Sequence, residues 1–425
     1  MAASDHHQTP TLPLLIKFHD VEKGSSTVEP HTLNSTKTTS FLTTTFNGLN
    51  ALSGVGILSV PYALSSGGWL SLILLFAIAG TTFYTGLLIK KCMEVDPDIR
   101  SYPDIGHKAF GPKGRLLVSI FMNLELYLVA TGFLILAGDN LHNLLPDVRI
   151  DVFGIVINGR QSFVLLVALI LTPTVLIDNM TTLSYISATG VFASVIILAS
   201  ILWSGMSEGI GFRHKGVLLN WSGLPTAFSL YAFCYCAHPV FPTLYTSMTN
   251  RRHFSGVLFV CFTFCTFAYV TTAVLGYLMF GGELQSQITL NLPTDRLSSK
   301  VAVYTALITP ISKYGLMLKP IVETIESHFR SCCEKRFYGL FVKTGLVGSS
   351  VVVALTLPFF GSLMSLVGAS LSVTASILLP CFCYLKISYR KIGIESAFIV
   401  FALLMGLVIL VVGTYTSFLE IVHSL

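Results

Sequence analysis

Eleven long apolar runs follow one another through the chain and leave little room for any other kind of structure. They lie near residues 41–65, 68–90, 115–145, 161–177, 184–207, 221–248, 255–280, 300–325, 340–358, 360–385 and 395–422. Most have the roughly 20 residues that an α-helix needs to cross a hydrocarbon core about 30 Å thick. Their apolar residues are continuous and do not alternate, which excludes a β-barrel. The runs therefore predict an all-α membrane protein with eleven transmembrane helices.

The composition narrows the class of protein further. Of 425 residues, 53% are hydrophobic and only 11% are charged, and the mean hydropathy is +0.74. Soluble globular domains carry about 25% charged residues. These values exclude a soluble enzyme, a disordered protein and a secreted disulfide scaffold. The net charge of +5 is small and calls for no nucleic-acid partner.

The polar segments predict how the chain is oriented. Residues 1–39 are rich in Ser and Thr and are predicted to be a disordered tail. If this tail is cytosolic, Lys and Arg on the cytosolic side outnumber those on the opposite side by about three to one. The positive-inside rule thus places the N-terminus in the cytosol. Eleven helices then bring the C-terminus to the opposite side of the membrane.

The first apolar run is predicted to contain a break. Gly54 and Gly56 flank a single residue, and Pro61 follows. Glycine tolerates non-helical backbone angles and lets a ligand approach the main chain. A break at membrane depth is tolerated where the freed N–H and C=O groups face protein or a polar cavity, and such groups can bind an amino acid or a cation. The alternative is that these glycines only allow close packing of helices.

A second break is predicted five helices later. Pro239 and Pro242 lie in the middle of the sixth run, and each proline removes a backbone hydrogen bond. Two breaks at corresponding positions indicate a transporter built from inverted repeats, with its binding site near the midplane. The predicted repeats are residues 40–207 with helices 1–5 and residues 208–392 with helices 6–10. Residues 393–425 would form helix 11.

Ionisable residues at membrane depth are candidates for function. Glu125 in the third run and Lys313 in the eighth are expected near the midplane, and His238 lies beside the second break. Any of the three could move protons. Lys313 could instead be a permanent cation that replaces a sodium ion and braces helix 1 against helix 8, or it could form an ion pair with Glu125. His238 could also simply cap the freed backbone.

The sequence offers no catalytic or metal site. Walker A, His-Glu-x-x-His and Gly-x-Ser-x-Gly patterns are absent, so no enzyme activity and no cofactor other than coupling protons are expected. The nine cysteines lie mostly within apolar runs, where small buried side chains are a sufficient explanation. Cys332 and Cys333 adjoin basic residues, which leaves palmitoylation open.

Several motifs resemble those of the amino acid/auxin permease family, and most closely those of its plant vacuolar branch. The matching segments are residues 47–63, 101–115, 138–141, 238–248, 288–293 and 309–315. The resemblance implies a LeuT-like fold, with a 5+5 inverted repeat plus one extra helix. It also implies proton-coupled secondary transport of amino acids, neutral ones foremost, as antiport across the vacuolar membrane. A monomer is expected, and the plasma membrane is the alternative location.

The resemblance also assigns the binding residues. Substrate would be bound by Asn50, Ser53, Gly54, Val55, Gly56 and Ile57 in the first break and by Phe233, Cys236 and His238 in the second. Asn50 matches an asparagine that belongs to the cation site of sodium-coupled relatives, whereas the positive charge of Lys313 disfavours a sodium ion nearby. The alternative function is an amino acid sensor or scaffold that binds without transport, although a tail of about 39 residues is short for signalling. The absence of rings of pore charges argues against a channel.

Overall fold

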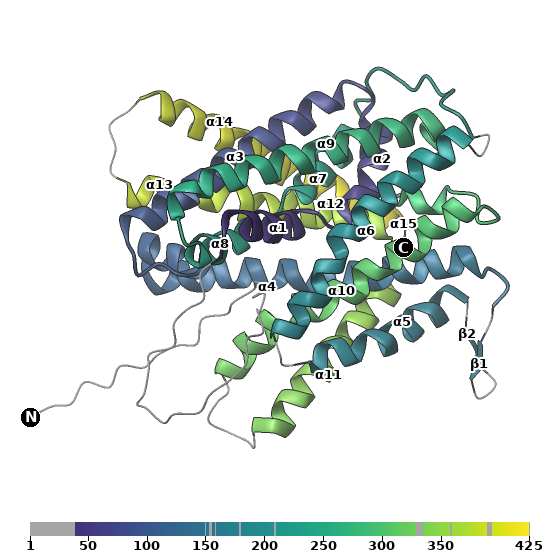
Figure 1. Ribbon diagram of the computed structural model, residues 1–425, viewed down its shortest axis with the longest axis horizontal. Coiled ribbons are helices and arrows are strands. Elements are labelled where there is room, and N and C mark those ends of the chain that lie inside the picture. The colour runs from purple at the N-terminus through teal and green to yellow at the C-terminus, as the bar shows by residue number, and fades with distance from the viewer. Residues whose placement is uncertain are drawn as a thin grey trace, which may run out of the picture.

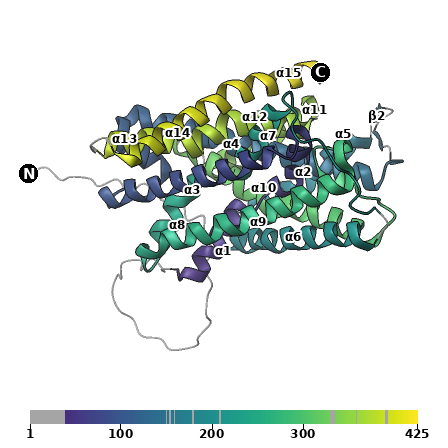
Figure 2. The same cartoon turned by 90° about the horizontal axis from the view of Figure 1, so that it is seen from above.

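The chain forms a bundle of long, roughly parallel helices with one short hairpin at one end (Figures 1 and 2). The computed structural model describes residues 39–424, apart from residues 149, 153–154, 158, 178–179, 208–209, 329–334, 358 and 389–392. The predicted tail up to residue 38 and the Cys332–Cys333 pair lie outside the described residues. Both views place α8 and α13 at one end, here called the α8 end. The strands β1 and β2 lie at the other, here called the hairpin end.

The helices follow the apolar runs closely. In chain order the first half contains α1 (Phe41–Leu52), α2 (Gly56–Gly67), α3 (Ser71–Val95), α4 (Tyr102–Leu144), β1 (Ile150–Val152), β2 (Ile155–Ile157), α5 (Gly159–Leu176) and α6 (Met180–Ser207). The second half contains α7 (Leu224–Cys234), α8 (Phe241–Ser247), α9 (Phe254–Phe280), α10 (Leu297–His328), α11 (Lys335–Thr356), α12 (Phe360–Val367), α13 (Leu379–Ile387), α14 (Ile394–Val408) and α15 (Thr414–Ser424). Short 3₁₀ or π-helical turns join several of these helices.

The described residues contain nine helices that are long and apolar enough to cross a membrane. The count rises to ten if α1 and α2 form one span, bent by 51° at its break. Two of the nine are composite, because π-helical turns link α12 to α13 and α14 to α15. The structure is therefore an all-helical membrane protein. It also adds a small antiparallel hairpin, β1 with β2, that the sequence analysis did not predict.

The interrupted helices lie inside the bundle and the straight helices surround them. α2 packs against α7 and α9, so the two broken segments are neighbours. α6 and α10 pack along one another, and α10 also contacts α4 (Figure 1). Packing against intact helices such as α9 allows broken backbone at membrane depth, because its polar groups meet protein and not lipid.

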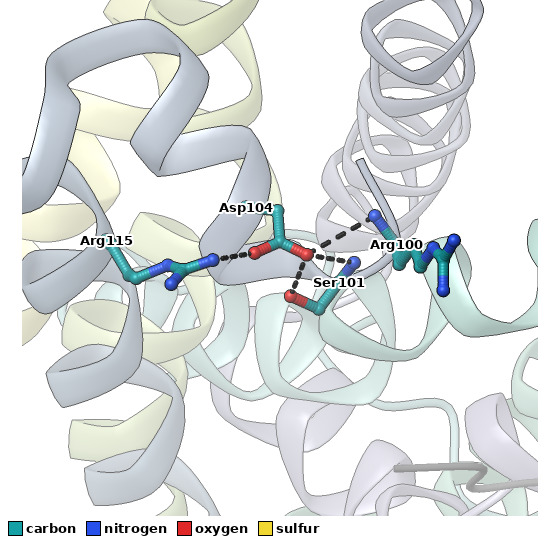
Figure 3. Close-up of polar contacts among 4 residues, drawn as sticks. All are labelled: Arg100, Ser101, Asp104 and Arg115. Carbon is teal, nitrogen blue, oxygen red and sulfur yellow. Dashed lines mark hydrogen bonds and ion pairs between the residues drawn. The ribbon is translucent and has the colours of Figure 1, made fainter. Parts of the chain in front are cut away.

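The predicted loop between the second and third spans forms the first turns of α4. Ser101 caps this helix, and the Asp104 carboxylate accepts hydrogen bonds from the Ser101 N–H and hydroxyl and from the Arg100 N–H. Arg115 pairs with the other oxygen of the same carboxylate (Figure 3). The helix bends between them at Gly111, whose φ of 69° and ψ of −156° suit only glycine. The cap and the ion pair thus hold the two sides of the bend together.

We expect Gly111→Ala to destabilise the protein through backbone strain alone. A Cβ at this position would meet no atom within 4 Å, so only the unfavourable φ/ψ would act. Such strain costs about 1–3 kcal/mol, which should lower the thermal unfolding temperature in detergent.

Gly80→Ala in α3 is the matched control for this substitution. Its Cβ also meets nothing within 4 Å, but Gly80 is helical. Alanine favours a helix by about 0.5–1 kcal/mol over glycine, so this variant should be unchanged or more stable. An equal loss of stability in both variants would contradict the assignment of strain to Gly111.

Candidate functional site

The first break lies between Leu52, the last residue of α1, and Gly56, the first residue of α2. The last carbonyl groups of α1 have no helical N–H partners, because the chain leaves the helix at Ser53. The Ser53 N–H turns back to the Leu49 carbonyl at 2.7 Å. Side chains of other helices donate hydrogen bonds to the next carbonyl groups, so contacts from across the bundle stabilise the end of α1.

Lys313 provides most of these contacts. Its Nζ donates to the Asn50 carbonyl at 2.9 Å and to the Ser53 carbonyl, and the side chain is almost fully buried. Gly190 on α6 makes room for it, since a Cβ there would lie 3.0 Å from the Lys313 Cε. The ammonium therefore lies at the C-terminal end of α1, where the helix dipole favours a positive charge.

Tyr269 of α9 donates a hydrogen bond to a further carbonyl group at the end of α1. It was not among the predicted site residues. Its hydroxyl lies 2.7 Å from the Leu52 carbonyl oxygen and 3.2 Å from the Cys234 carbonyl oxygen. Leu52 and Cys234 are the last residues of α1 and α7, so one side chain reaches both breaks. Sequence reasoning had no signal for it, because Tyr269 lies within an uninterrupted apolar helix.

The second break separates α7 from α8. A 3₁₀ turn at His238–Val240 fills the space between them, and Pro239 fits this turn without interrupting a helix. His238 is fully buried, and its Nε2 lies 2.9 Å from the Thr85 Oγ1 and 3.0 Å from the Thr82 carbonyl oxygen on α3. The ring also packs on Phe241, with centroids 4.8 Å apart. These contacts join the second break to α3.

Glu125 of α4 reaches the same break from another side. Its Oε1 accepts from the Cys236 thiol at 2.7 Å and from the Ser372 hydroxyl at 2.6 Å. Ser372 belongs to the first of two π-helical turns, Gly368–Ser372 and Thr374–Leu378, that lie between α12 and α13. Such turns are frequent at functional sites. The carboxylate thus joins three elements through neutral donors.

Glu125 and Lys313 do not pair with each other. Each has partners of its own, and none of the Lys, Arg or His residues that the structure describes forms an ion pair with Glu125. The ion pair that the sequence left open is therefore not formed. A buried carboxylate without a cation is stable chiefly in its neutral, protonated form.

The two breaks lie in direct contact at Gly56. A Cβ on Gly56 would lie 2.7 Å from the Cys234 Sγ and 3.2 Å from the Cys234 Cα. Of the other predicted binding residues, Val55, Ile57 and Phe233 are buried, whereas Gly54 is partly exposed and has open space beside it. The structure thus places Gly56 of the first break against Cys234, the last residue of α7 and the neighbour of Phe233.

A cavity of about 530 Å³ lies at the hairpin end, beyond these breaks. Tyr62 of α2 and Phe360 of α12 line it together with Asp139 and Arg160. The Asp139 Oδ1 accepts from the Arg160 Nε at 2.6 Å, and the Asp139 Oδ2 accepts from the Gln287 amide at 3.0 Å. Asp139 was not among the predicted site residues, and both of its partners follow it by more than 20 residues in the chain.

No group of three or more metal-binding side chains occurs within the described ranges. The arrangement is instead that of a binding site, with two broken helices, a buried ammonium and a buried carboxyl group. Comparison with known proteins identifies its class. Residues 37–419 match the family described as transmembrane amino acid transporter protein. The chain belongs to this family.

Two relatives from Arabidopsis thaliana illustrate how close the family match is. Amino acid transporter AVT1J is 57% identical over 413 residues, which cover 96% of this chain and 97% of the relative. Amino acid transporter AVT1I is also 57% identical, over 91% of this chain and 96% of the relative. The resemblance predicted from the sequence is confirmed.

The fold of this amino acid transporter is similar to that of a solved structure, the crystal structure of MhsT in complex with L-phenylalanine. The two superimpose with a TM-score of 0.56 over 90% of this chain and 98% of that chain, at 12% sequence identity. This similarity supports the LeuT-like fold that the motifs implied.

We expect Gly56→Ala to separate the two breaks of the transporter. The added methyl group would overlap the Cys234 sulfur, so α2 and α7 would have to move apart. Amino acid binding to the purified variant, measured calorimetrically, should weaken by at least about tenfold, which corresponds to about 1.4 kcal/mol.

Two comparisons isolate the cause of this loss. Gly54→Ala adds the same methyl group to the same break with no atom within 4 Å, so its effect should be smaller. Cys234→Ala combined with Gly56→Ala removes the overlapping sulfur and should recover part of the affinity. Equal losses in both single variants would show that the contact between Gly56 and Cys234 is not important.

Proposed function

We propose that the protein is a proton-coupled transporter of neutral amino acids that works as an antiporter across the vacuolar membrane. The observation that supports this most directly is the position of Lys313. Its ammonium binds the Asn50 and Ser53 carbonyls at the end of α1. A fixed positive charge there opposes binding of a sodium ion by Coulomb repulsion. The driving ion must then be bound elsewhere.

Glu125 is the proposed proton carrier. The carboxyl group is 5% exposed and its two donors are the uncharged Cys236 and Ser372, both on Oε1. Oε2 remains as the atom on which a proton can reside. Loss of that proton leaves a buried charge, which would be stabilised only if the surrounding helices move or water enters. Protonation and helix movement are thereby linked.

His238 has a positioning role in this proposal. Its Nε2 is within hydrogen-bond distance of the Thr82 carbonyl, so this nitrogen carries the hydrogen. The buried Nδ1 has no acceptor among the described residues for a second hydrogen, which favours the neutral imidazole. The ring is held between α3 and Phe241. The histidine thus anchors the start of α8. Lys313 and Glu125 are then the two residues whose charge matters in this proposal.

The substrate is proposed to lie between the two breaks. The start of α2 at the first break suits a carboxylate, since the N-terminal end of a helix attracts negative charge. Val55, Ile57 and Phe233, which adjoin the two breaks, have apolar and buried side chains. Apolar walls favour neutral amino acids, and the solved structure with a similar fold binds L-phenylalanine.

The architecture is proposed to contain eleven spans. α1 with α2 and α7 with α8 each count as one broken span, although α7 and α8 have only 11 and 7 residues. Residues 40–207 and 208–392 would form the inverted repeats, and α14 with α15 would form the last span. The cavity at the hairpin end would be the route to the site from the side opposite the cytosol. A cytosolic N-terminus, a monomeric state and the vacuolar location rest on the charge distribution and on the family resemblance.

Purified protein in proteoliposomes with an imposed pH gradient tests this function. In sodium-free buffer, we expect accumulation of radiolabelled neutral amino acids that stops when a protonophore collapses the gradient. No gradient-dependent flux across a panel of neutral amino acids would refute transport. Binding without any flux would favour the alternative of an amino acid sensor.

We expect Glu125→Gln to abolish accumulation but not amino acid binding. Glutamine keeps the shape of the side chain and can still accept from Cys236 and Ser372, but it cannot release a proton. Uptake driven by the gradient should fall by more than about tenfold, whereas exchange of labelled for unlabelled amino acid at equal pH should persist. Glu283→Gln, at an exposed position of the hairpin end, is the matched control and should behave as the wild type. Accumulation by Glu125→Gln at the wild-type rate would exclude Glu125 as the proton carrier.

A further inference from the structure

We propose that Tyr269 is a positioning residue that makes the two broken helices act as one binding site. The inference rests on the proposed function, because it concerns the site at which the amino acid would be held. Its basis is one hydroxyl group that lies within hydrogen-bond distance of both helix ends. The phenol oxygen lies 2.7 Å from the Leu52 carbonyl oxygen and 3.2 Å from the Cys234 carbonyl oxygen.

The two carbonyl groups have the same position in their helices. Each belongs to the last residue of a half-helix, where the carbonyl has no N–H of the next turn to accept from. Both helix ends carry partial negative charge, so they repel each other when they approach. A phenol O–H placed between them offsets that repulsion and satisfies an acceptor that water could not reach.

The hydroxyl of Tyr269 thus contacts the last residue of each half-helix, Leu52 in α1 and Cys234 in α7. Because a phenol has a single proton, the two carbonyl oxygens share it, and displacement of either break changes the hydrogen bonding of both.

The phenol ring is itself fixed, which allows the hydroxyl to set distances. Tyr269 is 1% exposed, and the ring of Tyr235 packs against it edge-on with centroids 5.5 Å apart. Tyr235 is anchored in turn by a hydrogen bond from its hydroxyl to the Thr266 Oγ1 at 2.9 Å. α9 thus presents a firmly held hydroxyl group to the ends of two half-helices.

A consequence for transport follows from this arrangement. An amino acid held between the breaks needs both at the correct separation, and its apparent affinity falls with the fraction of molecules that have that geometry. Without the phenol O–H the two breaks move independently, so this fraction decreases. Tyr269 would then affect affinity and the joint movement of the breaks without touching the substrate.

Tyr269→Phe tests the inference because it removes the hydroxyl and keeps the ring. We expect the dissociation constant for a transported neutral amino acid to rise about tenfold, as for loss of one buried hydrogen bond. In the absence of substrate, hydrogen exchange followed by mass spectrometry should accelerate in residues 52–57 and 233–238 by similar factors. Acceleration in only one of the two segments, or unchanged affinity, would overturn the inference.

Tyr277→Phe is the matched control on the same helix. Tyr277 is also buried, and its hydroxyl accepts from the Val217 N–H at 2.8 Å, far from either break. This variant should keep wild-type affinity and wild-type exchange in both segments. If it showed the same changes as Tyr269→Phe, a general effect of removing a buried hydroxyl from α9 would replace the proposed role.

A second substitution covers the case in which Tyr269→Phe does not fold. Para-aminophenylalanine at position 269 keeps the ring and offers two N–H groups, one for each carbonyl. Affinity within about twofold of the wild type is expected, because each helix end keeps a donor; a tenfold loss would overturn the inference. Wild-type protein that shows no gradient-driven flux would refute the proposed function alone, since binding and hydrogen exchange do not depend on it.

Discussion

The carbonyl groups at the end of α1 need hydrogen-bond donors, and the rest of the structure depends on this constraint. Inside a membrane such groups need partners, and no water or lipid is available to provide them. Four of them have hydrogen-bond donors here. The Ser53 N–H donates to the Leu49 carbonyl, and the Tyr269 hydroxyl donates to the Leu52 carbonyl. The Lys313 ammonium donates to the Asn50 and Ser53 carbonyls. These partners come from α10 and α9 as well as from the break itself. The broken span formed by α1 and α2 is therefore stable only inside a bundle whose other helices position these side chains.

The second break meets the same requirement with a different set of groups. His238 connects it to α3, Glu125 connects its Cys236 thiol to α4 and to a π-helical turn, and Tyr269 connects it to the first break. The positive charge lies at one break and the acidic group at the other. This separation supports a division of roles in which Lys313 stabilises a backbone end permanently and Glu125 exchanges a proton during the transport cycle.

The fold was largely predictable because the signals for it are local. Apolar runs of the length of a membrane mark the helices, and Gly54, Gly56, Pro239 and Pro242 mark the two breaks. Glu125 and Lys313 stood out because charge is rare in such runs. Their partners were not predictable: the sequence left an ion pair between them open, and the structure gives each a different environment. Tyr269 and Gly190 carry no local signal, since an aromatic residue or a glycine within an apolar helix is ordinary. Their importance arises only from which helices pack together.

The central claim is that protons, and not sodium ions, are coupled to amino acid movement because Lys313 occupies the end of α1. Its most direct test records the internal pH of proteoliposomes when an amino acid gradient is imposed in sodium-free buffer with no initial pH difference. Coupling is reciprocal, so the account predicts a sustained change of internal pH that depends on the amino acid gradient. Amino acid movement without any change of internal pH, or movement that requires sodium, would contradict it.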